Sequence, residues 1–271
     1  MLAGENAIDR GREHALRDYV FDNDSPRIAE QHRCQAEVLD PLTVGRLAGI
    51  GVGGAWRCLD IGTGGGSVAR WLAARVGPAG EVIATDVAPR PVPGPSVLRH
   101  DIVRDPLPGN GFHLIHARLV LQHLPARDRL VPKLVAALRP GGYLAIDEFD
   151  TGYSPALVGD QRARGAYQAF VTAKERVFRA AGGDSTWGRR VAQRMGEAGL
   201  VGIDPAVWVE VWRGGSPGAR LQRSHTHLAE RAFRRVGLTD RQLAEIREVL
   251  SDPEFHFMSP VRYWVVGRRA G

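Results

Sequence analysis

The sequence predicts an α/β protein built on one doubly wound, mostly parallel sheet of seven strands. From about residue 56 to residue 149, short apolar runs alternate with helical patterns. This order is expected when helices cover both faces of a parallel sheet. Two further apolar runs, VWVEVW (207–212) and VRYWVVG (261–267), lie nearer the C-terminus and complete the seven strands.

The elements of the first half follow one another closely. SVARWLAARV (67–76) is the first predicted helix, and the sequence GPAG ends it. A second helix is predicted at 126–138, where apolar residues such as Leu130 and Leu134 recur at helical spacing. Pro-Gly-Gly then terminates that helix. Four predicted strands of this half are 56–61, 81–86, 96–102 and 143–149, and the segment 112–121 contains one more.

Beyond residue 150 the alternation lapses and helical patterns dominate. The first fifty residues are also predicted to be mostly helical, with DNDSP (22–26) as a break. No repeat, low-complexity tract or linker divides the chain, so we expect a single domain over residues 1–271. The helices predicted in the second half are 155–182, 188–199, 218–236 and 239–250.

The composition is that of an ordinary globular protein, with 44% hydrophobic and 24% charged residues. A net charge of +6 and a pI near 9.9 suggest a nucleic-acid ligand at first sight. However, the arginines are scattered, no block of five like charges occurs, and Lys133 and Lys174 are the only lysines. We therefore expect no nucleic-acid partner.

No segment suggests a membrane partner. No run approaches the ~20 apolar residues of a membrane span, and the first residues contain early acids and no apolar signal core. Cys34 and Cys58 are the only cysteines, and no spacing pattern pairs them. The expected location is the cytoplasm.

The segment CLDIGTGGG (58–66) forms a glycine-rich turn between the first strand and the first helix. Glycines let the backbone turn sharply and leave space for a ligand against the main chain. A dinucleotide is one candidate ligand. Gly64, Gly66 and Ala69 satisfy the G-x-G-x-x-G/A spacing, and Asp86 lies about 20 residues further on.

Asp60 favours a different ligand. Pyrophosphate gains from amides and a helix N-terminus, and an added carboxylate would repel it. S-adenosylmethionine instead presents a sulfonium and an ammonium, and both cations are attracted to an acid. The alternative is that Asp60 is a strand-end residue that caps a turn.

Five segments in this order resemble the successive motifs of class I S-adenosylmethionine-dependent methyltransferases: LDIGTGGGS, EVIATDV, RHDIVRDPLP, FHLIHARLVLQHLP and LRPGGYLAIDEF. They cover about residues 56–149. The resemblance implies a Rossmann-like fold, S-adenosylmethionine as cofactor and S-adenosylhomocysteine as product. The flanking segments DPLTVGRL, WRGGSPGAR and SPVRYWVVGRR resemble, more loosely, actinobacterial small-molecule methyltransferases of natural-product pathways.

The resemblance also implies roles for individual residues. Asp86 is similar to the acid that holds the ribose hydroxyls, since one carboxylate can accept from two of them. Val87 is expected on one adenine face, Asp101 at the adenine amino group with Ile102 beside the ring, and the Arg118 backbone beside the methionine part. Asp86 and Asp101 as solvated turn acids, and an Arg118 side chain that faces solvent, remain alternatives. The residues expected along the methionine part are Asp60, Gly62, Thr63, Gly64 and Gly66.

Other enzyme classes find less support. No tyrosine is followed four residues later by lysine, which excludes short-chain dehydrogenases and leaves other NAD(P)-dependent oxidoreductases as an alternative. His225 and His227 are interpreted as surface histidines, and without an H-E-x-x-H motif no metal site is expected. No G-x-S-x-G nucleophile elbow occurs.

Four side chains are candidates near the transferred methyl group. His123 follows the fourth strand and is a candidate base, with packing or helix capping as its alternative. Glu148 ends the fifth strand, at the edge where open α/β sheets bind ligands. Tyr19 is expected to close over the site, and Arg33 to pair with the methionine carboxylate.

The acceptor is expected to be a small molecule. Residues 1–50 would form a helical cap, 56–149 the cofactor-binding core, and 150–182 with 213–257 a lid over the substrate. Aromatic residues in these parts favour an apolar or aromatic acceptor, although core packing is their alternative role. A non-catalytic protein of the same fold, and methylation of nucleic acid or protein, remain alternative functions. A homo-oligomer is compatible with the sequence.

Overall fold

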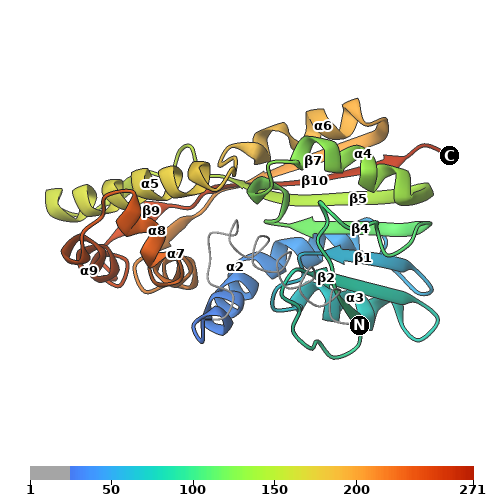
Figure 1. Ribbon diagram of the computed structural model, residues 1–271, viewed down its shortest axis with the longest axis horizontal. Helices are drawn as coiled ribbons and strands as arrows, with labels where there is room; N and C mark the ends of the chain where they lie inside the picture. Colours follow the sequence, from blue (N-terminus) through green and yellow to red (C-terminus); the bar gives the residue numbers. More distant parts are fainter. Residues whose placement is uncertain (1–24) are drawn as a thin grey trace, which may run out of the picture.

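The computed structural model describes residues 25–271, so Tyr19 lies outside the described residues. Its central sheet has the strand order β3-β2-β1-β4-β5-β10-β7 (Figure 1). The first five strands in the chain are parallel, and β10 runs antiparallel to both of its neighbours. The predicted doubly wound, mostly parallel sheet of seven strands is therefore confirmed. The strands are β1 (Arg57–Ile61), β2 (Glu81–Asp86), β3 (Ser96–Arg99), β4 (Phe112–Arg118), β5 (Leu138–Asp150), β7 (Leu200–Trp208) and β10 (Val261–Arg269).

Alternation along the strands gives the sheet two apolar faces. Leu59 and Ile115 face the helices α4 (Arg127–Ala137) and α6 (Val191–Glu197), whereas Cys58 and Leu114 face α2 (Ile28–Gly49) and α3 (Ser67–Val76). Figure 1 shows these two helix layers on opposite sides of the sheet. Near the carboxyl ends of the strands, the α2 side of the sheet becomes polar, and the candidate site lies there.

A second, smaller unit follows β5. It consists of the antiparallel sheet β6-β9-β8, which is surrounded by helices and lies at the far end of the molecule from β1 and β2 (Figure 1). Its core is aromatic, because Tyr167, Phe255 and Phe257 pack with ring centroids 4.8 to 5.7 Å apart. The elements are β6 (Ala156–Val158), α5 (Gln161–Ala180), β8 (Val211–Arg213), α7 (Pro217–Leu228), α8 (Glu230–Arg235), α9 (Asp240–Val249) and β9 (His256–Met258).

Several sequence-based boundaries are wrong. The third strand ends at Arg99 and not at residue 102, and the fifth begins at Leu138, so that Pro-Gly-Gly lies within it. The run 207–212 is split between β7 and β8, which belong to different sheets. Strand β7 already begins at Leu200. The sequence hides this start because β7 is an edge strand, mostly exposed and interrupted by Pro205, which an edge tolerates. The run predicted as helix from residue 155 begins as β6. The fourth strand, predicted to lie within 112–121, ends at Arg118.

The remaining predicted helices are present with adjusted limits. The segment predicted at 188–199 is a 3-10 turn (η2, Trp187–Arg190) followed by α6, and 218–236 contains both α7 and α8. Within residues 25–271, no helix combines the length and the apolar character needed to cross a bilayer.

The small sheet provides the first testable prediction. Phe257 is completely buried among aromatic rings, so Phe257→Ala should lower the free energy of unfolding by about 3–5 kcal/mol. Val211 lies on the neighbouring strand and is 58% exposed, so Val211→Ala should change it by less than about 0.5 kcal/mol. Urea unfolding followed by far-UV circular dichroism measures both, and equal midpoints for the two variants would contradict the packing described.

Candidate functional site

A cleft runs along the carboxyl ends of β1, β2 and β4, beneath α2. Two adjoining hollows form it, and we call them together the sheet-edge cleft. One hollow extends toward the ends of β2 and β3, and the other toward the start of α3. The residues that line both hollows are His32, Gln35, Ile61, Gly62, Gly64, Arg90, Arg118 and Leu119.

The glycine-rich turn forms the floor of this cleft. Gly62, Gly64 and Gly66 have φ angles of 64°, 54° and 72°, a region that favours glycine. A Cβ at Gly62 would lie 2.3 Å from a methyl group of Val120, so the space there is also restricted. The turn is held by the Gly66 amide, which donates to the Thr63 carbonyl at 2.8 Å. These glycines let the chain turn from β1 into α3 directly beneath the cleft.

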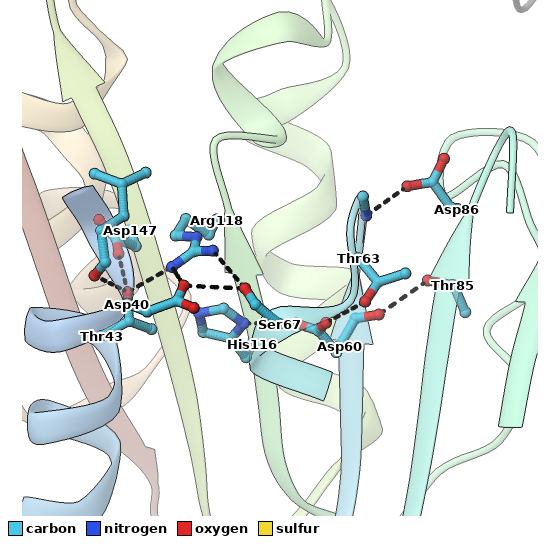
Figure 2. Close-up of polar contacts among 12 residues, drawn as sticks. Asp40, Thr43, Asp60, Thr63, Ser67, Thr85, Asp86, His116, Arg118 and Asp147 are labelled. Atoms are coloured by element: carbon cyan, nitrogen blue, oxygen red, sulfur yellow. Dashed lines mark hydrogen bonds and ion pairs between the residues drawn. The ribbon is translucent and has the colours of Figure 1, made fainter. Parts of the chain in front are cut away.

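Asp60 is buried at the end of β1, with 3% of its surface exposed. Its carboxylate lies 2.7 Å from Nδ1 of His116 on β4 and accepts a 2.7 Å hydrogen bond from the Thr63 hydroxyl (Figure 2). Both Asp60 and His116 line the cleft. His116 is not among the residues predicted from the sequence. It follows Leu114 by two residues, so the two side chains lie on the same face of β4.

Asp86 lies at the end of β2, in the hollow nearer β3. Its carboxylate accepts hydrogen bonds from the amides of Gly64 at 3.0 Å and Ala88 at 2.9 Å. Val87, Asp101 and Ile102 line the same hollow. The structure thus brings together residues that lie up to 40 positions apart in the sequence.

Asp101 also organises its own loop. Its carboxylate accepts from the amide of Val103 at 2.9 Å, and Arg104 lies 3.5 Å away. These contacts fix the loop that carries Ile102 into the cleft.

Arg118 points from the end of β4 toward α2. Its guanidinium donates to Asp40 at 2.8 Å and to Thr43 at 3.0 Å, and it also reaches the Ser67 hydroxyl at the start of α3 (Figure 2). Arg33 is exposed on α2 and lines the same hollow. This half of the cleft therefore presents arginines together with hydroxyl groups.

Beneath Arg118, a buried ion pair joins α2 to the sheet. Arg262 of β10 donates to both carboxylate oxygens of Asp147 on β5, and also to the Thr43 hydroxyl at 2.6 Å and the Leu39 carbonyl at 2.9 Å. Burial opposes the charge of Asp147, but Arg262, together with Arg118 and His116, outweighs that effect and lowers the pKa of the carboxyl below its usual value. The pair fixes the position of α2 over the cleft.

Behind the cleft lies an enclosed hollow, which we call the side chamber. Four residues line both spaces and mark their junction: Gln31, Gln35, Leu119 and His123. Leu119 has a φ of 54°, a strained value for a leucine, and its amide donates to the Asp147 carbonyl. The other residues of the chamber are Gln122, Phe149, Thr151, Lys174, Val177, Phe178, Ser185, Leu221, His225, Ala229 and Phe233.

Comparison with known proteins assigns the chain to a family. A model described as "Methyltransferase domain" matches residues 17–242. The chain belongs to this methyltransferase family. Its cofactor is accordingly S-adenosylmethionine, as the motifs from β1 to β5 implied.

Individual relatives agree with that assignment. The chain is 36% identical over 78 residues to "Methyltransferase str2" of Strobilurus tenacellus, an alignment that spans 29% of this chain and only 27% of that protein. A putative methyltransferase of Bacillus halodurans has a similar fold, with 15% identity and a TM-score of 0.55 over 84% of this chain and 99% of its own. A putative sarcosine dimethylglycine methyltransferase of Galdieria sulphuraria has 12% identity and a TM-score of 0.51, with 98% of both chains covered.

The sheet-edge cleft of this methyltransferase fits S-adenosylmethionine. Each oxygen of Asp86 holds one backbone amide and can accept a further hydrogen bond, as vicinal ribose hydroxyls require. Ile102 supplies an apolar surface for a ring. At the opposite end, Arg33 and Arg118 can face a carboxylate, and Asp60 adds a buried acid beside them. The nucleoside and amino-acid parts of the cofactor would therefore each find suitable groups in this cleft.

Of the predicted catalytic residues, His123 lies at the junction of cleft and chamber. Its ring packs against Phe178, with centroids 4.7 Å apart. Burial, reinforced by the charges of Lys174 and Arg127, lowers the pKa of His123 to about 3. The imidazole is therefore neutral at physiological pH, suited to hydrogen bonding and weak as a base. Its catalytic role stays a prediction.

Glu148 has a different environment from the one expected. It is fully buried, and its Oε1 accepts from the amides of Leu121 at 2.7 Å, Val120 at 3.2 Å and Gln122 at 3.4 Å. It does not line the cleft or the chamber. Glu148 instead holds the backbone of the turn η1 (Leu121–His123), which carries His123.

The prediction that His225 lies on the surface is wrong. Helix α7 packs against α2, and His225 is buried between them at the chamber. Burial lowers the pKa of His225 well below its ordinary value, and Lys174 adds to the effect. His227, two residues on, is partly exposed. No local pattern in the sequence marks this difference, because burial of α7 depends on α2, which is distant in the chain.

Gly62 allows a matched test of the turn. Gly62→Ala should lower stability by about 1–3 kcal/mol, because alanine is strained at this φ and its Cβ meets Val120. Adding Val120→Ala should recover part of the loss by making space. Gly45, on α2, has open space where a Cβ would stand, so Gly45→Ala should raise stability by about 0.5–1 kcal/mol. Urea unfolding distinguishes these cases, and an unaffected Gly62→Ala protein would contradict the turn geometry.

Glu148 gives a prediction with a defined pH dependence. Burial raises its pKa to about 8, although the three amides act in the opposite direction. Because the folded pKa lies above the unfolded value near 4.5, its contribution to stability is complete below pH 4.5 and declines as the pH rises to 8. The free energy of unfolding of the wild type should decline by up to about 1.4 kcal/mol per pH unit in this range. Glu148→Gln keeps an acceptor oxygen but does not titrate, so its stability should lack this decline.

Urea unfolding from pH 5 to pH 8 measures the Glu148 effect. Glu148→Ala leaves the amides without their acceptor and should be about 1–3 kcal/mol less stable than Glu148→Gln over the whole range. A wild type that runs parallel to Glu148→Gln at every pH would contradict the raised pKa.

Proposed function

We propose that the chain transfers the methyl group of S-adenosylmethionine to a small molecule bound in the side chamber. The observation that carries this proposal is the junction of the chamber with the cleft at Gln31, Gln35, Leu119 and His123. A methyl donor in the cleft and an acceptor in the chamber would meet there. The chamber is enclosed by side chains from α2, α5 and α7, which favours a compact acceptor over a macromolecule.

The walls of the chamber support an acceptor with an apolar or aromatic body. Phe149, Val177, Phe178 and Phe233 provide hydrophobic surface, and their contact with a ring or an alkyl group would exclude water. The loose resemblance of the flanking segments to natural-product methyltransferases agrees with such an acceptor. A cytoplasmic location and a homo-oligomer stay predictions from the sequence.

The residues of the chain act mainly by positioning. When bound, S-adenosylmethionine supplies a methyl group already activated by the sulfonium. The protein then needs to hold the acceptor in line and to keep water out. Neutral His123 can accept a hydrogen bond from a hydroxyl or amine of the acceptor, which orients a lone pair toward the junction. Leu119, held in its strained conformation, lines both spaces at their junction.

Cofactor binding tests this proposal directly. S-adenosylmethionine and S-adenosylhomocysteine should each raise the melting temperature, and Asp86→Ala should weaken both about tenfold or more by removing the ribose acceptor. Asp204→Ala, on the exposed edge strand β7, is the control and should leave both affinities unchanged. Calorimetry gives the constants. Stabilisation by NAD alone would contradict S-adenosylmethionine as the cofactor. Transfer of a labelled methyl group into protein or nucleic acid, and not into small molecules, would contradict a small-molecule acceptor.

A further inference from the structure

The side chamber contains one strongly basic side chain. Of the described residues that line it, Lys174 is the only lysine or arginine, and none is an aspartate or glutamate. Lysine is otherwise nearly absent from this chain, which uses arginine for almost all of its basic positions. An ammonium placed among phenylalanine and valine side chains is costly unless an anion or a set of acceptors compensates it.

The contacts of Lys174 compensate it only in part. Its ammonium donates to Oε1 of Gln222 on α7 at 2.8 Å and lies 5.9 Å from the ring centroid of Phe170. Within residues 25–271, no carboxylate lies within ion-pair distance of it. Burial lowers the pKa of Lys174 to about 8, so most of the molecules carry the charge at neutral pH. An ammonium has three hydrogens, and one neutral acceptor satisfies only one of them.

A second buried group beside Lys174 has one donor atom without a partner. Gln222 is 3% exposed, and its Nε2 has no hydrogen-bond partner among the described residues. Burying an amide donor without a partner costs about 1–3 kcal/mol. Gln222 does not itself line the chamber, and its Oε1 holds the Lys174 ammonium from behind. Lys174 is therefore the donor that a ligand in the chamber can reach.

The nearby histidines do not supply a negative charge. His123 and His225 have lowered pKa values because of burial, and the ammonium of Lys174 lowers them further. Neutral imidazoles can still donate or accept hydrogen bonds. Among the described lining residues the net charge of the chamber is therefore positive, which favours an anionic ligand.

We propose that the methyl acceptor is a small organic acid whose carboxylate binds Lys174. This inference rests on the proposed function, and it narrows the acceptor from an apolar molecule to one with an apolar body and an acidic end. Carboxylates and ammonium groups form charge-assisted hydrogen bonds, which are stronger than neutral ones. The body of the acid lies against Val177, Phe178 and Phe233.

The carboxylate is the anchor and a different atom is methylated. Lys174 lines the chamber but not the cleft, whereas Leu119 and His123 line both. A molecule held at Lys174 therefore presents its other end to the junction. The acceptor has two functional ends, an acid that binds and a nucleophile that reacts.

The two lysines make a direct test feasible. Protein labelled with [ε-¹³C]lysine gives two side-chain signals, one from Lys174 and one from Lys133, which donates to the carbonyls of Ile102 and Asp105 outside the chamber. With S-adenosylhomocysteine present, 3-phenylpropionate, 4-hydroxybenzoate and octanoate are titrated against their primary amides. Each acid that binds should move the Lys174 signal with saturation and raise its pKa, while the Lys133 signal stays in place.

Variants separate charge from fold. Lys174→Met should lose about tenfold or more in affinity for the acids and nothing for the amides, and Lys174→Arg should keep the preference for acids. S-adenosylhomocysteine should bind all variants equally, which shows that they are folded. Failure of that binding in the wild type would refute the proposed function.

Three results would overturn this inference alone. One is equal binding of acids and amides to wild type that binds S-adenosylhomocysteine. Another is an unmoved Lys174 signal with every acid at tens of millimolar. The last is an acid preference that survives in Lys174→Met.

Discussion

The buried ion pair between Arg262 and Asp147 is the interaction on which the site depends. It connects β10 and β5 to the Thr43 hydroxyl and the Leu39 carbonyl, so the sheet and α2 share one hydrogen-bonded centre. Arg118 extends the network to Asp40 and Ser67 (Figure 2). Removing one partner of such a pair leaves an uncompensated buried charge, which is strongly destabilising. Helix α2 is fixed by these contacts, and α2 roofs both the cleft and the chamber.

The network exists because strand periodicity places its members on one face. Asp60, His116, Arg118 and Asp147 all alternate in step with the apolar residues that pack on α3. Toward the amino ends of the strands, that face is a hydrophobic core. Toward the carboxyl ends it becomes polar, and a ligand can approach. The same face therefore stabilises the fold at the amino ends of the strands and contacts the ligand at their carboxyl ends.

The two units of the protein contribute different things to the site. The main sheet supplies the glycine-rich turn and Asp86, which suit the cofactor. The smaller unit supplies Lys174 on α5 and His225 on α7, which decide what else can enter. The electrostatics of the two spaces differ accordingly, because the cleft contains carboxylates and the chamber contains none among its described lining residues. Leu119, strained at their junction, separates them.

The sequence by itself determined the sheet, the turn and the cofactor family. Strand alternation, glycine spacing and the positions of Asp60 and Asp86 are local patterns, and each can be recognised within a few residues. Tertiary structure alone decided the chamber. Lys174, His225 and Gln31 lie on three helices that meet only after folding, so no local pattern relates them. It also reassigned Glu148, because a strand-end acid is catalytic or structural according to the backbone amides that surround it.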